Sequence, residues 1–322
     1  MKILEFSNTI SSLVKMKFNF NEVYQIESGA SQKKIYRFKN KDKEGVVVDF
    51  SYNYKDFDSF LEVNKFLSTI NISIPKIFDI DESKHLILME DFGNKRYDNI
   101  INSMDIKDLM LNSINSLIEI QNSSQLITNY NLDKYNFSSF KIEIAEFVDF
   151  YLPFKNISKS IADEFFVIWH SEFENLNFNW NSFVHKDFEL SNLMYLHNRE
   201  DHLKCGILDY QNAFIGFSGW DMFSLLENPR IYFDDKYNDE LIEYFFNNTN
   251  QHLSFDEFLT QYYFLNTARQ SRIIGRWINL DKKNKNNNYS KYLDVTTKRL
   301  KKSLYYLQNQ KLSKLYSKVM AE

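Results

Sequence analysis

Two nearby stretches decide how this chain is interpreted: FVHKDFELSNLMYL at residues 183–196 and GILDYQNAFIGFSGWD at residues 206–221. The first gathers His, Asp, Ser and Asn between apolar runs. The second holds three of the seven glycines of the chain. Packing alone does not require either feature, so a chemical reason for both is expected.

The composition favours two coupled lobes over one core. The chain has 322 residues, of which 43% are hydrophobic, and single cores stop growing at roughly 250–300 residues. Its net charge of −4 argues against a nucleic-acid partner, because such domains usually carry a basic stripe. The lysine-rich segment from Lys298 to Lys318 is the local exception, and it is typical of a solvated helix face.

Membrane insertion and secretion are not expected. The first twenty residues mix polar and apolar positions and lack a small-residue cleavage pattern, unlike a signal peptide. No apolar run approaches the roughly 20 residues that span a bilayer. The single cysteine, Cys205, excludes a disulfide framework, and its apolar neighbours predict a buried thiol. We therefore expect a cytoplasmic protein without a membrane partner.

The sequence pattern changes near residue 95. Before it, β-branched runs and polar turns predict five antiparallel strands, with one amphipathic helix at about residues 55–69. From Ser103 onward, segments with a 3.6-residue period predict helices, and only residues 193–209 resemble strands, as a hairpin that turns at NRED.

The predicted fold is therefore α+β. A small antiparallel-sheet lobe, residues 1–94, would bind nucleotide, and a larger, mainly helical lobe, residues 95–322, would hold the catalytic and substrate-binding groups. Clefts between lobes are preferred ligand sites.

Three oxygen-bearing side chains are expected to converge at the hairpin. Asp187 precedes Asn192 by five positions on the loop that enters the hairpin, and the far strand ends at Asp209. One carboxylate could orient a hydroxyl. The amide and the second carboxylate could bind Mg²⁺, which prefers oxygen ligands and takes only one or two carboxylates. Phosphoryl transfer needs little more, because it depends mostly on positioning and charge neutralisation.

The pattern H-x-D-x-x-x-x-N, followed by an aspartate at the end of the next hairpin, resembles the aminoglycoside phosphotransferase and choline kinase superfamily. Both quoted stretches are most similar to a subgroup that phosphorylates the anomeric hydroxyl of N-acetylmuramate and N-acetylglucosamine in cell-wall sugar recycling. SGASQKKIYRF at 28–38 and TARQSRIIGRW at 267–277 also resemble that subgroup. The resemblance implies a bilobal protein-kinase-like fold, ATP and Mg²⁺ as cofactors, and an amino-sugar substrate.

The resemblance also implies a role for each residue of the pattern. Asp187 would orient the acceptor hydroxyl and take its proton, although a loop-capping aspartate is the alternative. Asn192 and Asp209 would bind magnesium. His185 would support the loop, and Asp221 would cap the following helix or hold the catalytic loop.

Nucleotide binding is expected in the sheet lobe. Backbone N–H groups of the loop SGAS could cover phosphates, with a plain hairpin turn as the alternative. The adenine would bind backbone groups where the last strand enters the linker. The residues predicted to bind nucleotide are Ser28, Gly29, Ala30, Ser31, Lys34, Arg37, Met89, Glu90 and Phe92.

One position departs from the protein-kinase pattern. The third strand has Asp49 where kinases keep the lysine that pairs with the phosphates. The amino-sugar subgroup also has an aspartate there, so the narrower resemblance is strengthened while the phosphate-binding charge stays unassigned. Lys33, Lys34 or Arg37 could supply that charge, and so could a second magnesium ion.

The acceptor site is expected on helices of the larger lobe. By the resemblance, Glu143, Arg269 and Arg272 match substrate-binding positions. The two arginines are spaced by three and share a helix face, from which they could grip a carboxylate such as the lactyl group of muramate. Surface ion pairs are the alternative for the arginines. Trp220 could stack on a sugar or merely pack.

The favoured function is an ATP- and Mg²⁺-dependent kinase of a small-molecule hydroxyl, with an N-acetyl amino sugar as the acceptor. A kinase of choline or an aminoglycoside is the alternative among enzymes. A nucleotide-binding pseudokinase with a regulatory role is the alternative from another class, and Asp49 is the feature that supports it.

Overall fold

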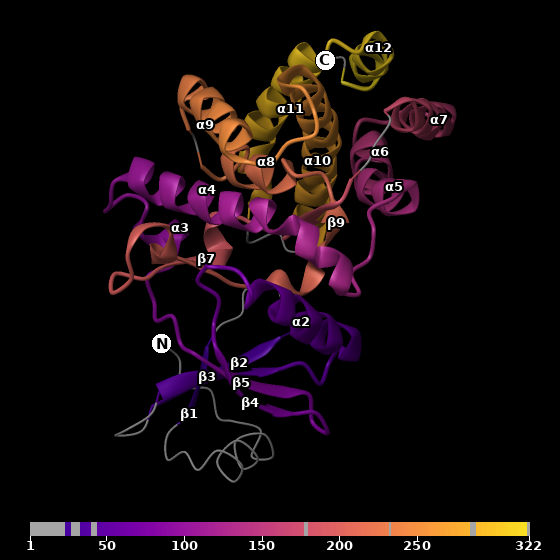
Figure 1. The fold of residues 1–322 in the computed structure, drawn as a ribbon. Coiled ribbons are helices and arrows are strands. Elements are labelled where there is room, and N and C mark those ends of the chain that lie inside the picture. The colour runs from indigo at the N-terminus through magenta and orange to yellow at the C-terminus, as the bar shows by residue number, and fades with distance from the viewer. Residues whose placement is uncertain are drawn as a thin grey trace. The chain divides into compact units, whose positions relative to one another are not determined.

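The structure is a computed structural model that describes residues 23–26, 33–39, 44–176, 180–231, 233–283 and 288–320. It divides into two compact units, whose elements are labelled in Figure 1. The sheet unit contains the described residues up to Leu132 together with Leu190–Ala213, and the helical unit contains Asp133–Glu189 and the described residues from Phe214 onward. The predicted division into a nucleotide-binding lobe at residues 1–94 and a catalytic and substrate-binding lobe at residues 95–322 stays a prediction. Within the described ranges no helix has the length and apolar character needed to cross a bilayer.

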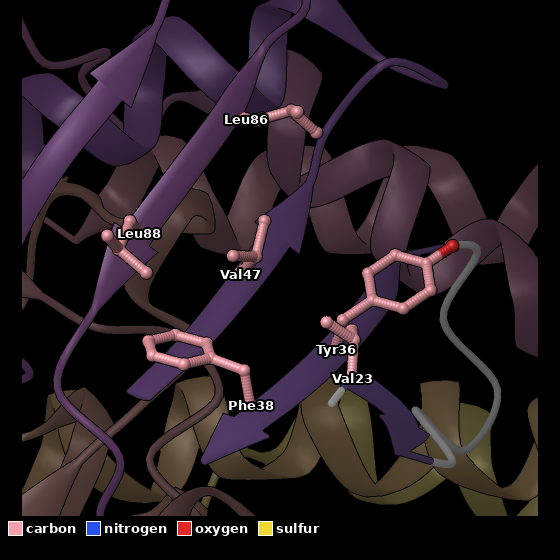
Figure 2. Close-up of a cluster of buried hydrophobic side chains, with 6 residues drawn as sticks. All are labelled: Val23, Tyr36, Phe38, Val47, Leu86 and Leu88. Atoms are coloured by element: carbon pink, nitrogen blue, oxygen red, sulfur yellow. The ribbon is translucent and has the colours of Figure 1, made fainter. Parts of the chain in front are cut away.

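The sheet unit is built on five antiparallel strands in the order β1-β2-β3-β5-β4. Their bounds are β1 Val23–Ile26, β2 Lys34–Lys39, β3 Glu44–Asp49, β4 Ile77–Asp81 and β5 Leu86–Met89. Because side chains alternate across a strand, apolar residues from neighbouring strands meet on one face. Figure 2 shows this buried cluster, which consists of Val23, Tyr36, Phe38, Val47, Leu86 and Leu88. All five predicted strands are confirmed.

Helix α2, Tyr54–Leu67, confirms the predicted helix between the third and fourth strands. It begins after Asn53, whose side chain accepts a hydrogen bond from the Lys55 N–H and so satisfies one of the free donors of the first turn. Its apolar face is buried, and the ring of Phe60 stacks on Tyr210 with 4.7 Å between centroids. This contact attaches α2 to the segment that follows the predicted hairpin.

The hairpin itself consists of β7, Leu193–Tyr195, and β8, Cys205–Ile207, which pair antiparallel as predicted. The N–H of Ile207 donates to the Ser73 carbonyl at 2.8 Å, and this bond ties the hairpin to the rest of the sheet unit. Cys205 is buried, as predicted. The remaining elements of this unit are α3 Tyr97–Ile100, α4 Ile106–Asn122, η1 Ser124–Asn129, η3 Leu190–Asn192, η4 Asp201–Lys204 and η5 Tyr210–Asn212.

The helical unit is organised around α10, Phe255–Lys283, a long helix whose middle turns are buried on all sides. Figure 1 shows α11 running beside it. The other helices are α5 Phe137–Glu146, the π-helix η2 Phe147–Tyr151, α6 Leu152–Phe154, α7 Lys159–Asn175, α8 Trp220–Leu226, α9 Asp235–Asn248, η6 Tyr289–Tyr292, α11 Leu293–Leu307 and α12 Gln310–Val319. The predicted α+β class, with an N-terminal antiparallel sheet and a mostly helical remainder, is confirmed.

One prediction for the helical part is wrong. Residues 193–209 are not its only strands, because β6, Ser182–Val184, pairs antiparallel with β9, Phe214–Gly216. Each strand has only three residues. The equally short β7 and β8 are marked by the polar turn between them, whereas β6 and β9 are far apart in the sequence and no shared turn indicates their pairing. The pair fixes the backbone directly before the loop that contains Asp187.

Gly275 allows α10 to cross the π-helix η2 at short distance. A Cβ atom at this position would lie 2.1 Å from the carbonyl oxygen of Glu146 and 2.7 Å from the amide nitrogen of Phe147. Both contacts are with backbone, which cannot move aside as a flexible side chain can. The close approach therefore requires glycine.

We predict that Gly275→Ala lowers the free energy of unfolding by about 1–3 kcal/mol, the usual cost of overpacking a close contact. The measurement is urea unfolding followed by circular dichroism. Lys282→Ala, on the exposed end of the same helix, is the control and should be close to wild type. A Gly275→Ala variant as stable as the wild type would contradict the tight crossing.

Candidate active site

The loop after β6, residues 185–189, is held by a buried carboxylate. Asp221, in the first turn of α8, is 1% exposed, and its two oxygens accept hydrogen bonds from the N–H groups of His185 at 2.7 Å and Lys186 at 3.0 Å. Lys186 has φ of 79°, a left-handed conformation that residues with a side chain rarely adopt. Of the two roles predicted for Asp221, these bonds support the holding of the loop.

Asp187 follows this anchored pair directly. The N–H of Glu189 donates to the Asp187 carbonyl at 2.9 Å, which closes the loop into a tight turn. Burial lowers the pKa of Arg269 to about 10 and the charge of Arg272 adds to this effect, whereas Asp187 is among the groups that raise it. Asp187 also contributes to raising the pKa of Arg272 against the effect of burial. Three predicted site residues therefore lie within electrostatic reach of one another in the helical unit.

Asn192 and Asp209 come together in the sheet unit. The N–H of Leu208 donates to the Asn192 carbonyl at 3.0 Å, which places Asp209 next to the hairpin entrance. Asp209 has φ of 66°, and its carboxylate accepts a hydrogen bond from the Gln211 amide at 3.2 Å. The described residues contain no group of three or more His, Cys, Asp or Glu side chains able to hold a metal ion. The Asn192 amide and the Asp209 carboxylate are a different set of ligands. Their oxygen atoms are of the kind that magnesium prefers.

The predicted nucleotide-binding residues have different surroundings. Ser28, Gly29, Ala30 and Ser31 lie outside the described residues. Lys34 is exposed on β2, with its Cα opposite that of Asp49. The Arg37 guanidinium donates to the Asp91 carboxylate and to the Gly93 carbonyl, both at 2.7 Å. Arg37 thus connects β2 to the segment that follows β5.

The end of β5 and the linker are held by a contact from the hairpin turn. The N–H of Glu90 donates to the Lys76 carbonyl at 2.8 Å, and the Glu90 carboxylate accepts from Arg199 at 2.6 Å. The same guanidinium lies 5.0 Å from the centroid of the Phe92 ring, a cation–π contact. Met89 is buried at the strand end. The adenine site predicted here stays a prediction.

The predicted acceptor residues meet in the helical unit. Glu143 on α5 is buried and lies 3.7 Å from Arg272 and 3.9 Å from the Lys186 ammonium. Arg269 is 6% exposed, and its Nη1, like the Nε of Arg272, is buried without a hydrogen-bond partner among the described residues. Buried donors nearly always have a partner. An oxygen atom of a ligand or of a water molecule can fill this place, and the surface ion pairing considered for the arginines does not apply.

Two residues of this cluster were not predicted. Lys186 stands between His185 and Asp187, so its position in the motif could have indicated it. Burial, followed by the charge of the Glu143 carboxylate, raises the pKa of the Tyr135 hydroxyl. No sequence pattern indicates Tyr135, since its neighbours belong to an irregular segment.

Trp220 is a packing residue in this structure. Its side chain is 2% exposed, and its ring meets Tyr135 and Phe214 edge to face at 4.9 and 5.1 Å between centroids. Almost no ring surface is available for stacking on a sugar. Of the two roles predicted for Trp220, the structure favours packing.

No protein-family model matches the chain. Among characterised proteins, it is similar to the N-acetylmuramate/N-acetylglucosamine kinases of Caulobacter vibrioides, with 23% identity over 195 residues, and Neisseria meningitidis, with 24% over 229 residues. The matches cover 54% and 67% of this chain and 50% and 65% of the relatives. The chain thus matches between half and two thirds of the length of these relatives.

Solved structures share the fold over nearly the whole chain. The ADP-bound aminoglycoside phosphotransferase APH(2'')-Ib has a TM-score of 0.58 with 14% identity, and the match covers 94% of this chain and 99% of that one. Choline kinase LicA from Streptococcus pneumoniae has a TM-score of 0.61 with 13% identity and the same coverage, and LicA has also been solved with AMP. The chain therefore has the protein-kinase-like fold of the aminoglycoside phosphotransferases and choline kinases, and its predicted resemblance to that superfamily is confirmed.

Proposed function

We propose that this chain is an ATP- and Mg²⁺-dependent kinase that phosphorylates the anomeric hydroxyl of N-acetylmuramate and N-acetylglucosamine. The observation that carries the proposal is the loop anchored on Asp221, which presents Asp187 near Arg269 and Arg272. A carboxylate for the hydroxyl proton and cations for an acidic substituent are what an acidic amino sugar requires. The names of the relatives described above support an N-acetyl amino sugar as the acceptor.

Asp187 is the proposed proton acceptor. Its carboxylate would orient the acceptor hydroxyl and take its proton as the hydroxyl oxygen forms a bond to the γ-phosphorus of ATP, while the bond from that phosphorus to the bridging oxygen breaks and ADP leaves. Kinases place an aspartate in this role because phosphoryl transfer depends chiefly on positioning of the nucleophile. The two bonds to Asp221 keep the preceding backbone in place, so the carboxylate needs little reorganisation when the acceptor binds.

Asn192 and Asp209 are the proposed magnesium ligands. Bound magnesium would neutralise charge on the phosphates. The Gln211 amide holds one oxygen of the Asp209 carboxylate at 3.2 Å and thereby orients it.

The acceptor specificity is proposed to come from the arginine pair. Arg269 Nη1 and Arg272 Nε are buried donors without protein acceptors among the described residues, and a carboxylate can accept from such donors at short distance. N-acetylmuramate has this carboxylate and N-acetylglucosamine lacks it. Glu143 limits the net charge of the cluster and would accept hydrogen bonds from sugar hydroxyls.

A choline or aminoglycoside kinase is the second candidate, since structural neighbours are named for these substrates. Both substrates are cations. The guanidinium groups of Arg269, which is buried, and Arg272, which is 12% exposed, would repel them near Asp187, so the arginine pair disfavours this alternative. The pseudokinase alternative has no comparable contact in its favour.

Replacing the two aspartates separates their roles. We expect Asp209→Asn to abolish turnover, because the carboxylate that binds the metal is lost. Asp187→Asn should lower kcat by about 10²–10⁴ with little change in KM, the usual effect of removing a general base. Asp201→Asn, the same change at an exposed position of the hairpin turn, is the control. Wild-type turnover by Asp209→Asn at saturating Mg²⁺ and ATP would contradict the metal assignment.

Asp221 should make stability depend on pH. Burial raises its pKa to about 7, so between about pH 4 and that value the folded chain keeps a proton that the unfolded chain has released. The free energy of unfolding should therefore fall as pH rises through this window. Between about pH 5 and about pH 8, the wild type should lose roughly 2–3 kcal/mol more than Asp221→Asn, which cannot titrate. Urea unfolding at both pH values measures this difference, and equal losses would show that Asp221 ionises normally.

The arginine pair is tested by the ratio of kcat/KM for N-acetylmuramate and N-acetylglucosamine. A charge-assisted contact contributes roughly 1.5–3 kcal/mol, so Arg269→Ala or Arg272→Ala should raise KM for N-acetylmuramate by about one to two orders of magnitude. N-acetylglucosamine should be affected less. Arg276→Ala is the control, because Arg276 is exposed on the same helix and pairs with Glu146 at 2.6 Å. An unchanged ratio in both variants would make the pair a structural feature of α10.

A further inference from the structure

Lys33 has an unusual position for a lysine of a small sheet. It directly precedes β2, its side chain is 7% exposed, and its ammonium group forms an ion pair with the carboxylate of Asp209. The ammonium also lies 5.6 Å from the centroid of the Phe50 ring. A buried cation is costly unless it is paired, and Asp209 supplies the pair for Lys33. The buried ammonium therefore lies beside the proposed magnesium ligand.

The neighbouring strand supplies no such cation. Strand β3 reads EGVVVD and ends in Asp49, which is 2% exposed and accepts a hydrogen bond from the Ser51 N–H at 2.9 Å. Asp49 and Asp209 also lie near a common group. That group is the Tyr52 hydroxyl. Its pKa is raised most by burial and by Asp56, and the charges of Asp209 and Asp49 raise it further. The anionic phosphates of a nucleotide would be repelled here unless a cation offsets the two acids.

The other two cations of this strand are placed differently. Lys34 is exposed, as expected from the alternation of side chains along a strand. Arg37 lies further along β2 and is bound to Asp91, Gly93 and Asn94 in the linker. Among the three candidates Lys33, Lys34 and Arg37, Lys33 is the one in contact with Asp209.

We propose that Lys33 is the cation that binds the nucleotide phosphates, in place of the lysine that β3 lacks. Its ammonium would reach the phosphates from the start of β2, beside the carboxylate of Asp209. Lys33 is a binding residue in this account and moves no proton. The inference rests on the proposed kinase function, because it presumes that a nucleoside triphosphate binds the sheet unit.

Calorimetric titration with ATP in Mg²⁺ and with adenosine tests the proposal without relying on turnover. Lys33→Met should weaken ATP binding by about 10- to 100-fold, the value of a charge-assisted hydrogen bond, and leave adenosine binding unchanged. Lys84→Met is the matched control, since Lys84 is an exposed lysine in the turn between β4 and β5. It should bind both ligands as the wild type does.

Three outcomes would overturn the proposal in distinguishable ways. Unchanged ATP affinity in Lys33→Met, with a wild type that binds ATP, removes the role of Lys33 and leaves the kinase function intact. An equal loss for ATP and adenosine means that Lys33 only supports the fold. A wild-type chain that binds no nucleotide contradicts the kinase function and this inference together.

A measurement on the wild-type chain covers the case in which Lys33→Met does not fold. The rate of lysine acetylation by acetic anhydride is followed by mass spectrometry, with Lys84 as the internal reference. ADP with Mg²⁺ should slow acetylation of Lys33 relative to Lys84, whereas adenosine should not. Equal rates with ADP and adenosine would contradict the proposal.

Discussion

The burial of one carboxylate is the constraint on which the candidate active site depends. Asp221 is out of contact with water, so its oxygens need donors from the protein, and the N–H groups of His185 and Lys186 supply them. To offer both N–H groups to one side chain, the backbone turns left-handed at Lys186. The next residue is Asp187. The two hydrogen bonds to Asp221 thus fix the orientation of the loop that contains Asp187, the proposed proton acceptor.

The proposed binding and catalytic roles are divided between the two units of the chain. The sheet unit holds Asn192, Asp209 and Lys33, oxygen ligands and a cation suited to a metal and phosphates. The helical unit holds Asp187 with the arginine pair, a base and donors suited to an acidic alcohol. The chain passes from one unit to the other between Glu189 and Leu190, within the stretch FVHKDFELSNLMYL.

Much of this could be predicted from the sequence, since each predicted feature leaves a local pattern. Strands with alternating or β-branched runs, the helix at Tyr54–Leu67 and the spacing from Asp187 to Asn192 are of this kind. The pairing of β6 with β9 leaves no such pattern, because no short turn joins the two strands. The packing of Trp220 depends on partners far away in the sequence. The choice of Lys33 over its neighbours also depends on a contact with a residue 176 positions away, which composition and periodicity cannot reveal.

The central claim, that this chain transfers phosphate from ATP to an N-acetyl amino sugar, is tested most directly by identifying the product. The purified chain is incubated with ATP, Mg²⁺ and separately N-acetylmuramate, N-acetylglucosamine, choline and kanamycin, and each mixture is examined by phosphorus NMR. The account predicts a new phosphomonoester signal with the amino sugars, coupled to the anomeric proton. A phosphorylated product from choline or kanamycin alone, or no new phosphate ester from any acceptor while ATP binds, would contradict it.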